Sequence, residues 1–344
     1  MRKITITLTV LLTLFACNRW KVSKLNPDLL CHIKPGSSDG GISLVFRDNA
    51  DILDMTFNLR ISDKAIYCAD NESKRLLVLS KSGDINRIIG PKSVSTEKNY
   101  SEFDFSSIGE ITDDKDGNIY VQNKLPKLTG NSEISPSYIL IFSKDGKLQE
   151  TLGQDGLTNS PFYYIDNMFT DDNNRLFVVS RTFESWSLSV FKDKKREYFS
   201  VFDKNSFSDS NSSGYNAVIE KIIPFRKSNS AIISVSFYDG TRFKFRKIFR
   251  IEIENNSKLK EVTTLPDPKN ELFTILEDKY LVFWEVEGKD IRFVIWSFQE
   301  NILNNLSIDL EEKKSYYDEI LSDENGKIYS YSVSREGISI YAWE

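Results

Sequence analysis

The chain contains very little histidine and cysteine, and this scarcity excludes several kinds of catalytic centre. His32 is the only histidine among 344 residues, and Cys17, Cys31 and Cys68 are the only cysteines. A histidine-rich zinc centre, a Ser-His-Asp triad and a Cys-His pair are excluded unless His32 itself takes part. His32 lies in a short predicted strand, so we expect it to have a packing or surface role.

The sequence also lacks glycine-rich nucleotide loops, a surplus of basic residues and a second long apolar run. No Walker-type or dinucleotide-binding motif occurs, and the formal net charge is −5. A net acidic chain has no electrostatic footprint of a nucleic-acid binder. After the leader, no apolar stretch approaches the roughly 18 residues of a membrane span. We therefore expect no cofactor and no nucleic-acid partner.

The first 16 residues have the features of a secretory leader. Two basic residues follow Met1, and residues 4–16 are mostly apolar. A cationic start, a short apolar core and a small residue at its end are typical of a signal peptide. As a helix, this apolar run rises about 20 Å, too short for a hydrocarbon core of roughly 30 Å. We therefore predict that residues 1–16 are a signal peptide and that the protein is exported.

Cys17 directly follows this leader and predicts a lipid anchor. The segment Leu14-Phe15-Ala16-Cys17 resembles the bacterial lipobox, in which the cysteine is acylated and becomes the mature N-terminus. The chain turns polar at once, which favours lipidation over an ordinary cleavage near Ala16 with Cys17 as a bystander. Acyl chains such as palmitate contribute about 0.8 kcal/mol per buried methylene, and two or more anchor stably. Residues 17–28 are then a lipid-anchored tether in the bacterial cell envelope, with the membrane and the leaflet left open.

A repeated pattern runs through the rest of the chain and predicts an all-β fold. Four segments share an Asp/Asn/Gly turn that leads into an aliphatic-aromatic pair: Ser62–Tyr67, Asp113–Tyr120, Asp171–Phe177 and Ser322–Tyr329. Gly and Asn tolerate the backbone of tight hairpins, and β-branched and aromatic residues fill pleated faces. Two weaker units, at residues 231–251 and 280–296, continue the rhythm at a spacing of roughly 50 residues. Four short strands per unit of this length predict a six-bladed β-propeller with four antiparallel strands in each blade.

The last repeat predicts how the ring closes. It provides three strands, at Tyr317–Leu321, Lys327–Val333 and Gly337–Trp343, and the sequence printed ends at Glu344 without a fourth. We predict that an N-terminal strand at Leu29–Ile33 completes this blade, which makes residues 29–344 the propeller. Closure hides sheet edges that otherwise template aggregation.

These repeats resemble NHL-type repeats, and parts of the chain resemble one family. The segments that carry the likeness are Ile108–Val121, Ser137–Gly156, Pro161-Phe162, Val178–Thr182 and the start Cys17-Asn18-Arg19-Trp20. They are similar to a family of spirochaete lipoproteins. The resemblance implies a propeller and a lipid anchor, and it brings no known activity with it.

The two cysteines inside the predicted propeller leave two interpretations open. Cys31 and Cys68 permit one disulfide in an exported protein. We favour two buried free thiols, because each lies on a predicted strand and free cysteine packs as a small hydrophobe.

Arginine recurs in the loops between the second and third strands of the predicted blades. These loops open on the face where propellers usually bind, and they carry the candidate ligand-binding residues Arg75, Arg181, Trp186, Arg242 and Arg335. Convergent guanidinium groups suit carboxylate or phosphate recognition through bidentate hydrogen bonds. Acidic residues in the same loops favour another interpretation, in which these arginines are solvated surface charges. The longest such loop, Lys124–Pro136, is the second candidate for gripping a partner.

Two function classes follow from this pattern. The first is a non-enzymatic envelope scaffold whose propeller binds a protein, a peptide or a glycan. The second is a divalent-metal-dependent propeller hydrolase of the lactonase kind, for which Glu110, Asn167 and Glu220 are candidate ligands near the blade starts. We favour the scaffold, assign no catalytic residue and assign no metal site. The calcium-like segment Asp113–Asn118 has its glycine at the wrong offset for an EF-hand, so we interpret it as a hairpin turn.

Overall fold

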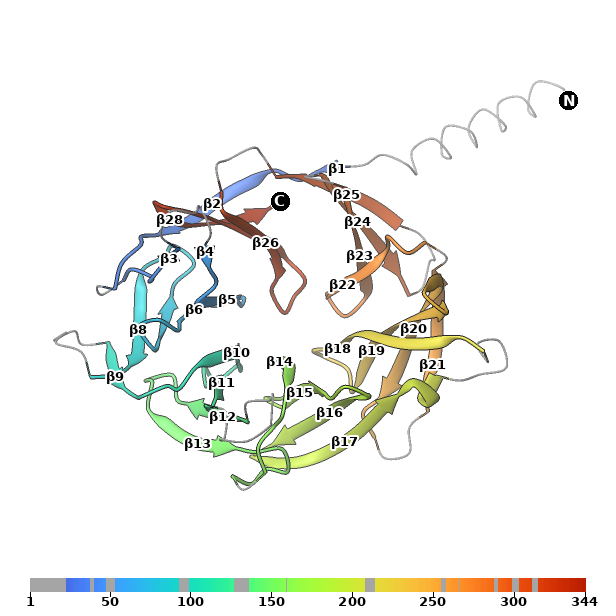
Figure 1. Cartoon of the computed structure of the whole chain (residues 1–344), viewed down its shortest axis with the longest axis horizontal. Coiled ribbons are helices and arrows are strands. Elements are labelled where there is room, and N and C mark those ends of the chain that lie inside the picture. Colours follow the sequence, from blue (N-terminus) through green and yellow to red (C-terminus); the bar gives the residue numbers. More distant parts are fainter. Residues whose placement is uncertain are drawn as a thin grey trace, which may run out of the picture.

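Six antiparallel sheets stand around a central axis in the computed structural model (Figure 1). The structure describes residues 23–37, 40–47, 53–92, 99–126, 136–158, 160–207, 214–254, 258–265, 267–287, 290–298, 303–310 and 315–344. Each sheet is one blade, and its first strand lies nearest the axis. The predicted six-bladed β-propeller is confirmed.

The blades follow one another in chain order, and each contains four antiparallel strands. Blade one comprises β5 (Phe57–Ile61), β6 (Ile66–Asp70), β7 (Arg75–Leu79) and β8 (Ile85–Gly90). Blade two comprises β10 (Ile108–Asp113), β11 (Ile119–Lys124), β12 (Ser137–Phe142) and β13 (Leu148–Leu152). Blade three comprises β14 (Ile165–Thr170), β15 (Leu176–Arg181), β16 (Ser185–Lys192) and β17 (Lys195–Asp203).

The remaining three blades complete the ring. Blade four comprises β18 (Asn216–Pro224), β19 (Ser230–Asp239), β20 (Arg242–Glu252) and β21 (Lys260–Leu265). Blade five comprises β22 (Glu271–Leu276), β23 (Tyr280–Glu287), β24 (Asp290–Ser297) and β25 (Leu303–Asp309). Blade six comprises β26 (Tyr317–Ser322), β27 (Ile328–Ser334), β28 (Gly337–Trp343) and the N-terminal β2 (Pro27–Ile33).

The predicted closing strand is confirmed. Strand β2 pairs antiparallel with β28, and the register joins Pro27 to Trp343 and Ile33 to Ile338. The strand begins two residues before the predicted Leu29. His32 stabilises the joint, because its Nε2 donates to the Glu336 carbonyl at 2.9 Å and its Nδ1 lies 3.1 Å from the Ser339 hydroxyl. The structural role expected of His32 is confirmed.

Several short elements were not predicted from the sequence. Strand β1 (Ser23–Lys24) runs parallel to β25 on the edge of blade five, and β9 (Tyr100–Glu102) runs parallel to β8 on blade one. Strands β3 (Val45–Phe46) and β4 (Leu53–Asp54) form a small separate sheet, and η2 (Lys204–Phe207) is a 3₁₀ turn. Two or three residues carry too little periodicity to be recognised as strands before their partners are known.

The apolar side chains gather between neighbouring blades. Each of six buried clusters joins two adjacent sheets, and the cluster between blades six and one contains both Cys31 and Cys68. Both cysteines are free and buried, as we predicted. Burial raises the pKa of the Cys31 thiol to about 11 and also raises that of Cys68.

Two predicted features fall outside the described residues. The signal peptide with Cys17 lies before residue 23, and residues 127–135 of the Lys124–Pro136 loop are also outside. In the part of the chain that the structure describes, no helix is long and apolar enough to cross a membrane.

Candidate functional site

The two faces of the ring differ because successive strands of a blade run in opposite directions. Turns between first and second strands lie on one face, which we call the floor: residues 62–65, 114–118, 171–175, 225–229, 277–279 and 323–327. Turns between second and third strands lie on the other face, which we call the mouth. The predicted ligand-binding residues are on the mouth.

Arg226 at the floor contacts side chains from three other blades. Arg226 of blade four has its guanidinium 3.9 Å from Asp63 of blade one and 3.2 Å from Asp172 of blade three. It also lies 3.7 Å from Glu324 and donates to the side chain of Asn325, both of blade six. Blades one and four are on opposite sides of the ring (Figure 1), so these contacts cross the central opening and close its floor end.

The repeated Asp/Asn/Gly turns supply this floor. Asp114 accepts the Asn118 backbone N–H at 2.8 Å and the Tyr120 hydroxyl at 3.0 Å. Asp323 repeats the arrangement with the Lys327 backbone N–H and the Tyr329 hydroxyl. The calcium-like segment is therefore a hairpin turn, as we interpreted it. Side-chain carboxylates that accept local backbone N–H groups stabilise such turns.

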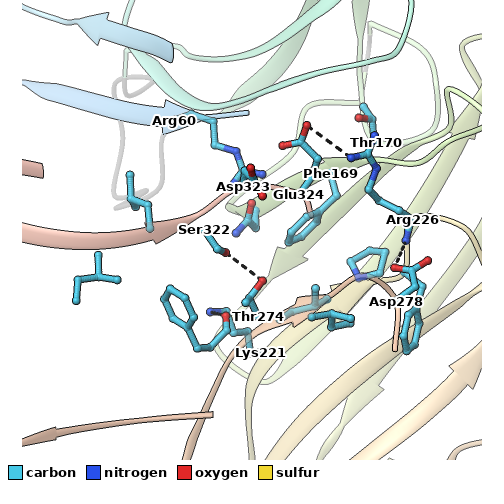
Figure 2. Close-up of a pocket in the computed structure, with 18 of the residues that line it drawn as sticks. Arg60, Phe169, Thr170, Lys221, Arg226, Thr274, Asp278, Ser322, Asp323 and Glu324 are labelled. Atoms are coloured by element: carbon cyan, nitrogen blue, oxygen red, sulfur yellow. Dashed lines mark hydrogen bonds and ion pairs between the residues drawn. The ribbon is translucent and has the colours of Figure 1, made fainter. Parts of the chain in front are cut away.

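The channel walls are built from equivalent positions of the innermost strands. The residue three positions before the last one of each innermost strand belongs to an upper ring: Asn58, Glu110, Asn167, Lys221, Phe273 and Glu319. Two residues further toward the floor, a lower ring follows: Arg60, Thr112, Phe169, Ile223, Leu321 and, in blade five, Ile275. Residues of both rings line a cavity of about 310 Å³ with Arg226 at its base (Figure 2).

Two partly buried groups in this channel have pKa values close to neutrality. Burial raises the pKa of Glu110 to about 7, although the positive charges of Arg60 and Lys124 oppose the shift. Burial lowers the pKa of Lys221 to about 8, although Asp166 opposes it. The Lys221 ammonium donates to the Phe273 carbonyl at 2.7 Å. Titratable groups perturbed in this way are concentrated at functional sites.

The three residues considered as metal ligands do not share one environment. Glu110 and Asn167 are in the upper ring, whereas Glu220 is occupied by a strong ion pair with Arg246. Burial opposes ionisation of Glu220, but the hydrogen bonds from Arg246 and Ser236 hold its pKa below the usual value. Across the described residues, no group of three or more His, Cys, Asp or Glu side chains is placed to hold a metal ion.

Among the predicted ligand-binding residues at the mouth, Arg75 is buried and has a structural role. Its side chain is only 7% exposed and pairs with the fully buried Asp70 at 3.2 Å. Its guanidinium also donates to the Gly41 carbonyl at 2.9 Å, which fixes the chain between blade six and blade one. The sequence places Arg75 in a mouth loop, but the long-range contact with Gly41 decides its surroundings.

Arg181 and Trp186 are in contact, as convergence at the mouth requires. The Arg181 guanidinium lies over the rings of Tyr164 and Trp186, at 4.7 and 5.5 Å from their centroids. The Nε atom of Arg181 also forms an ion pair with the Asp166 carboxylate at 3.3 Å. Next to this stack, Phe183 is 89% exposed. Phe183 and Trp186 line an open groove of about 970 Å³ between blades three and four, and Arg181 lies beside it.

Arg242 and Arg335 have other neighbours. Arg242 is exposed at the turn between β19 and β20 in blade four. Arg335 of blade six lies over the rings of Phe46 and Tyr316, and its Nε donates to the Tyr316 hydroxyl at 3.0 Å. The structure thus joins two of the five predicted residues and distributes the other three over blades one, four and six.

Sequence reasoning missed the two cations of the channel, Arg60 and Lys221. A signal for Arg60 exists, because Phe57, Leu59 and Ile61 alternate with polar residues and the alternation places Arg60 on the face opposite to the buried one. No such signal exists for Lys221, since a β-bulge between Ile219 and Lys221 shifts the register.

The fold defines the class of protein as a six-bladed β-propeller. No protein-family model and no curated protein matches the chain. Solved structures with a similar fold include a luciferin-regenerating enzyme, at 11% identity over 84% of this chain and 91% of that one, with a TM-score of 0.44. The WD40 propeller domain of Doa1 shares 11% identity over 92% and 97% of the chains, with a TM-score of 0.42.

A putative 6-phosphogluconolactonase from Bacteroides fragilis is a third similar structure. It shares 12% identity over 80% of this chain and 72% of that one, with a TM-score of 0.38. All three likenesses concern the overall fold alone. The resemblance to NHL-type repeats and to spirochaete lipoproteins therefore stays a prediction.

Proposed function

We propose that the protein is a lipid-anchored binding scaffold of the bacterial cell envelope. Cys17 carries the anchor, and the mouth of the propeller binds a protein, peptide or glycan partner. The observation that carries this proposal is the groove between blades three and four, where Phe183 is 89% exposed beside the Arg181–Trp186 stack. Phe183, Val201 and Val218 are exposed together along this groove, and a group of exposed apolar side chains rimmed by polar residues marks an interaction site.

The chemistry of the groove suits a partner with both apolar and polar groups. Phe183, Trp186 and Val218 provide apolar surface, and Asp203 and Lys204 provide charge along the same groove. Trp and Arg are enriched among the residues that carry most of the energy at interfaces. Because Tyr164 and Asp166 hold the Arg181 side chain, little conformational entropy is lost when a partner binds it.

The course of the N-terminus supports a mouth that points away from the membrane. Strand β1 runs parallel to β25, so the chain enters the edge of blade five from the floor side. Ser23 is six positions after Cys17, so the chain between them spans at most about 20 Å. A lipid on Cys17 keeps this edge close to the bilayer and leaves the groove on the opposite face accessible.

Affinity capture after cross-linking in the envelope tests the binding site. The double variant Arg181→Ala with Trp186→Ala should lose the captured partner, because truncating interface residues of this kind costs about 2 kcal/mol or more, roughly thirtyfold in affinity. A matched control is Arg196→Ala with Phe199→Ala, which removes a similar cation-π pair from the outer strand β17. If both double variants retain the partner equally, the groove is not the site.

Labelling with palmitate tests the anchor independently. Wild-type protein should incorporate the label and partition into detergent, and Cys17→Ala should do neither. Equal partitioning of the variant would show that Cys17 does not anchor the protein.

A further inference from the structure

The central channel contains a cation, Arg60, that no close ion pair of the described residues engages. Arg60 extends from β5 into the cavity of about 310 Å³ (Figure 2). Within the described residues, no hydrogen bond or close ion pair reaches its guanidinium. Arginine offers five donors in a planar fork, and a partly buried guanidinium without acceptors is costly unless a ligand supplies them. The Arg60 guanidinium therefore presents donors that suit an anionic group.

A second cation lies across the channel from Arg60. Lys221 belongs to blade four and Arg60 to blade one, on opposite sides of the ring (Figure 1). One of the three ammonium protons of Lys221 is used by the Phe273 carbonyl. An anion between these two cations gains attraction from both sides in a site of low dielectric.

The rest of the lining restricts the body of such a ligand. Phe169, Ile223, Ile275 and Leu321 make most of the lower ring apolar. The neutral polar side chains of the lining are partly occupied within the protein: the hydroxyls of Ser322 and Thr274 hydrogen-bond to each other at 3.0 Å, and the Thr170 hydroxyl donates to the Asp113 carbonyl. A cavity at the small end of the range for ligand sites takes a molecule of modest size. An apolar body with a single polar end fits this lining.

The acidic neighbours favour a single negative charge. Glu110 and Glu319 flank Arg60 from blades two and six, and Glu319 already accepts hydrogen bonds from Tyr317 and Tyr331. A dianion placed between the two cations is repelled by these carboxylates, whereas a monoanion balances the local charge. We propose that the channel binds a small monocarboxylate with an apolar body and that Arg60 is its anchor. This site is separate from the groove of the proposed scaffold.

Proton linkage gives the site a recognisable signature. Arg60, Lys124, Asp166 and Glu319 face Glu110, and Arg60, Asp166 and Glu271 face Lys221. Below pH 7 Glu110 becomes neutral and below pH 8 Lys221 is charged, so both changes strengthen binding of an anion. Affinity should fall severalfold or more between pH 6 and pH 9.

Isothermal titration calorimetry of the full-length protein in detergent tests the proposal with defined probes. Hexanoate should bind, whereas its neutral isostere hexanamide and the cation hexylamine should not. Inorganic phosphate should bind at least tenfold more weakly than hexanoate. Arg60→Gln should weaken hexanoate tenfold or more, and Arg87→Gln, on the outer strand of the same blade, should leave it unchanged.

Each other result overturns the proposal in a specific way. Equal binding of hexanamide would show that charge does not select the ligand, and tighter phosphate would assign the site to a phosphate group. Full hexanoate affinity in Arg60→Gln would remove Arg60 as the anchor. In Glu110→Gln the pH dependence should shrink while binding persists, and an unchanged pH profile would contradict the linkage. Loss of hexanoate binding here leaves partner capture at the groove unaffected, so the two proposals fail separately.

Discussion

The floor and the mouth of the ring are built from different kinds of sequence. The floor consists of the repeated turns, in which carboxylates such as Asp114 and Asp323 accept hydrogen bonds from their own backbone. Neighbouring carboxylates of the same turns, Asp63, Asp172 and Glu324, meet at Arg226. The mouth around blade three consists of residues that do not repeat, among them Arg181, Phe183 and Trp186. Repetition therefore marks the architecture of this propeller, and the unrepeated residues are those left free to bind.

The floor and the mouth are distinct faces only if the ring is closed. Deletion of β2 tests this closure, and we expect it to lower the unfolding free energy more than any other change considered below. The strand buries Cys31 and Ile33 in the cluster between blades six and one. Its loss should cost at least about 4 kcal/mol of unfolding free energy, because two buried side chains and one edge of β28 become exposed. Denaturant unfolding followed by circular dichroism measures this.

A matched pair of point variants controls for the deletion. Ile33→Asp places a charge where the side chain is 3% exposed, whereas Leu29→Asp on the same strand changes a residue that is 55% exposed. The first should destabilise strongly and the second should have an effect within about 0.5 kcal/mol. Equal effects would contradict closure by this strand.

Arg75 and Arg242 both lie at the mouth, but only Arg75 is buried, so we expect their removal to change the stability by different amounts. Arg75→Ala leaves the buried carboxylate of Asp70 without its cation and should cost about 3 kcal/mol or more. Arg242→Ala removes an exposed side chain and should change the stability by less than about 0.5 kcal/mol. Urea unfolding midpoints provide the measurement. A stable Arg75→Ala protein would mean that this arginine is not a structural brace.

Removal of Arg226 should break the floor and leave the mouth intact. Arg226→Ala loses contacts with Asp63, Asp172 and Glu324, and because these groups are only partly buried we expect a cost of about 2 kcal/mol. The exposed pair of Arg250 with Glu252 is the control, for which Arg250→Ala should cost less than about 0.5 kcal/mol. Partner capture should persist in Arg226→Ala at temperatures where it is folded. Loss of capture from the folded variant would contradict the division between the two faces.

The floor also predicts how stability depends on pH. Burial and the hydrogen bond with Asp63 raise the pKa of Glu324 to about 7. Burial opposes ionisation of Asp63 as well, but Glu324 and the positive charge of Arg226 bring its pKa below the usual value. Glu324 is protonated more readily in the folded state than in the unfolded state. The stabilising contribution of protonated Glu324 to the free energy of unfolding is therefore fully present below about pH 4.5, and it is lost as the pH rises through about 7.

Glu324→Gln keeps the neutral form at every pH and isolates this effect. Relative to wild type, the variant should gain about 1 to 2 kcal/mol of unfolding free energy at pH 8 and nothing at pH 4.5. Thermal unfolding at the two pH values measures the difference. A gain of the same size at both values would show that Glu324 does not titrate in this range.

The sequence predicted the architecture more completely than the site. The turns at Asp114 and Asp323 and the closing strand follow from local chemistry, since hairpin residues and alternating strands determine their own conformation. The surroundings of Arg75 depend on Gly41, and the position of Lys221 depends on a β-bulge. Such features arise only when distant segments meet, so residue type and spacing do not reveal them.

The most direct test of the division between floor and mouth is site-specific photo-cross-linking in the intact envelope. A photoreactive phenylalanine analogue replaces Phe183 at the mouth in one protein and Lys115 at the floor in another, because both positions are exposed. We predict a discrete cross-linked partner from position 183, abolished by Arg181→Ala with Trp186→Ala, and none from position 115. A partner cross-linked from position 115 and absent at 183 would place binding on the floor and contradict the account.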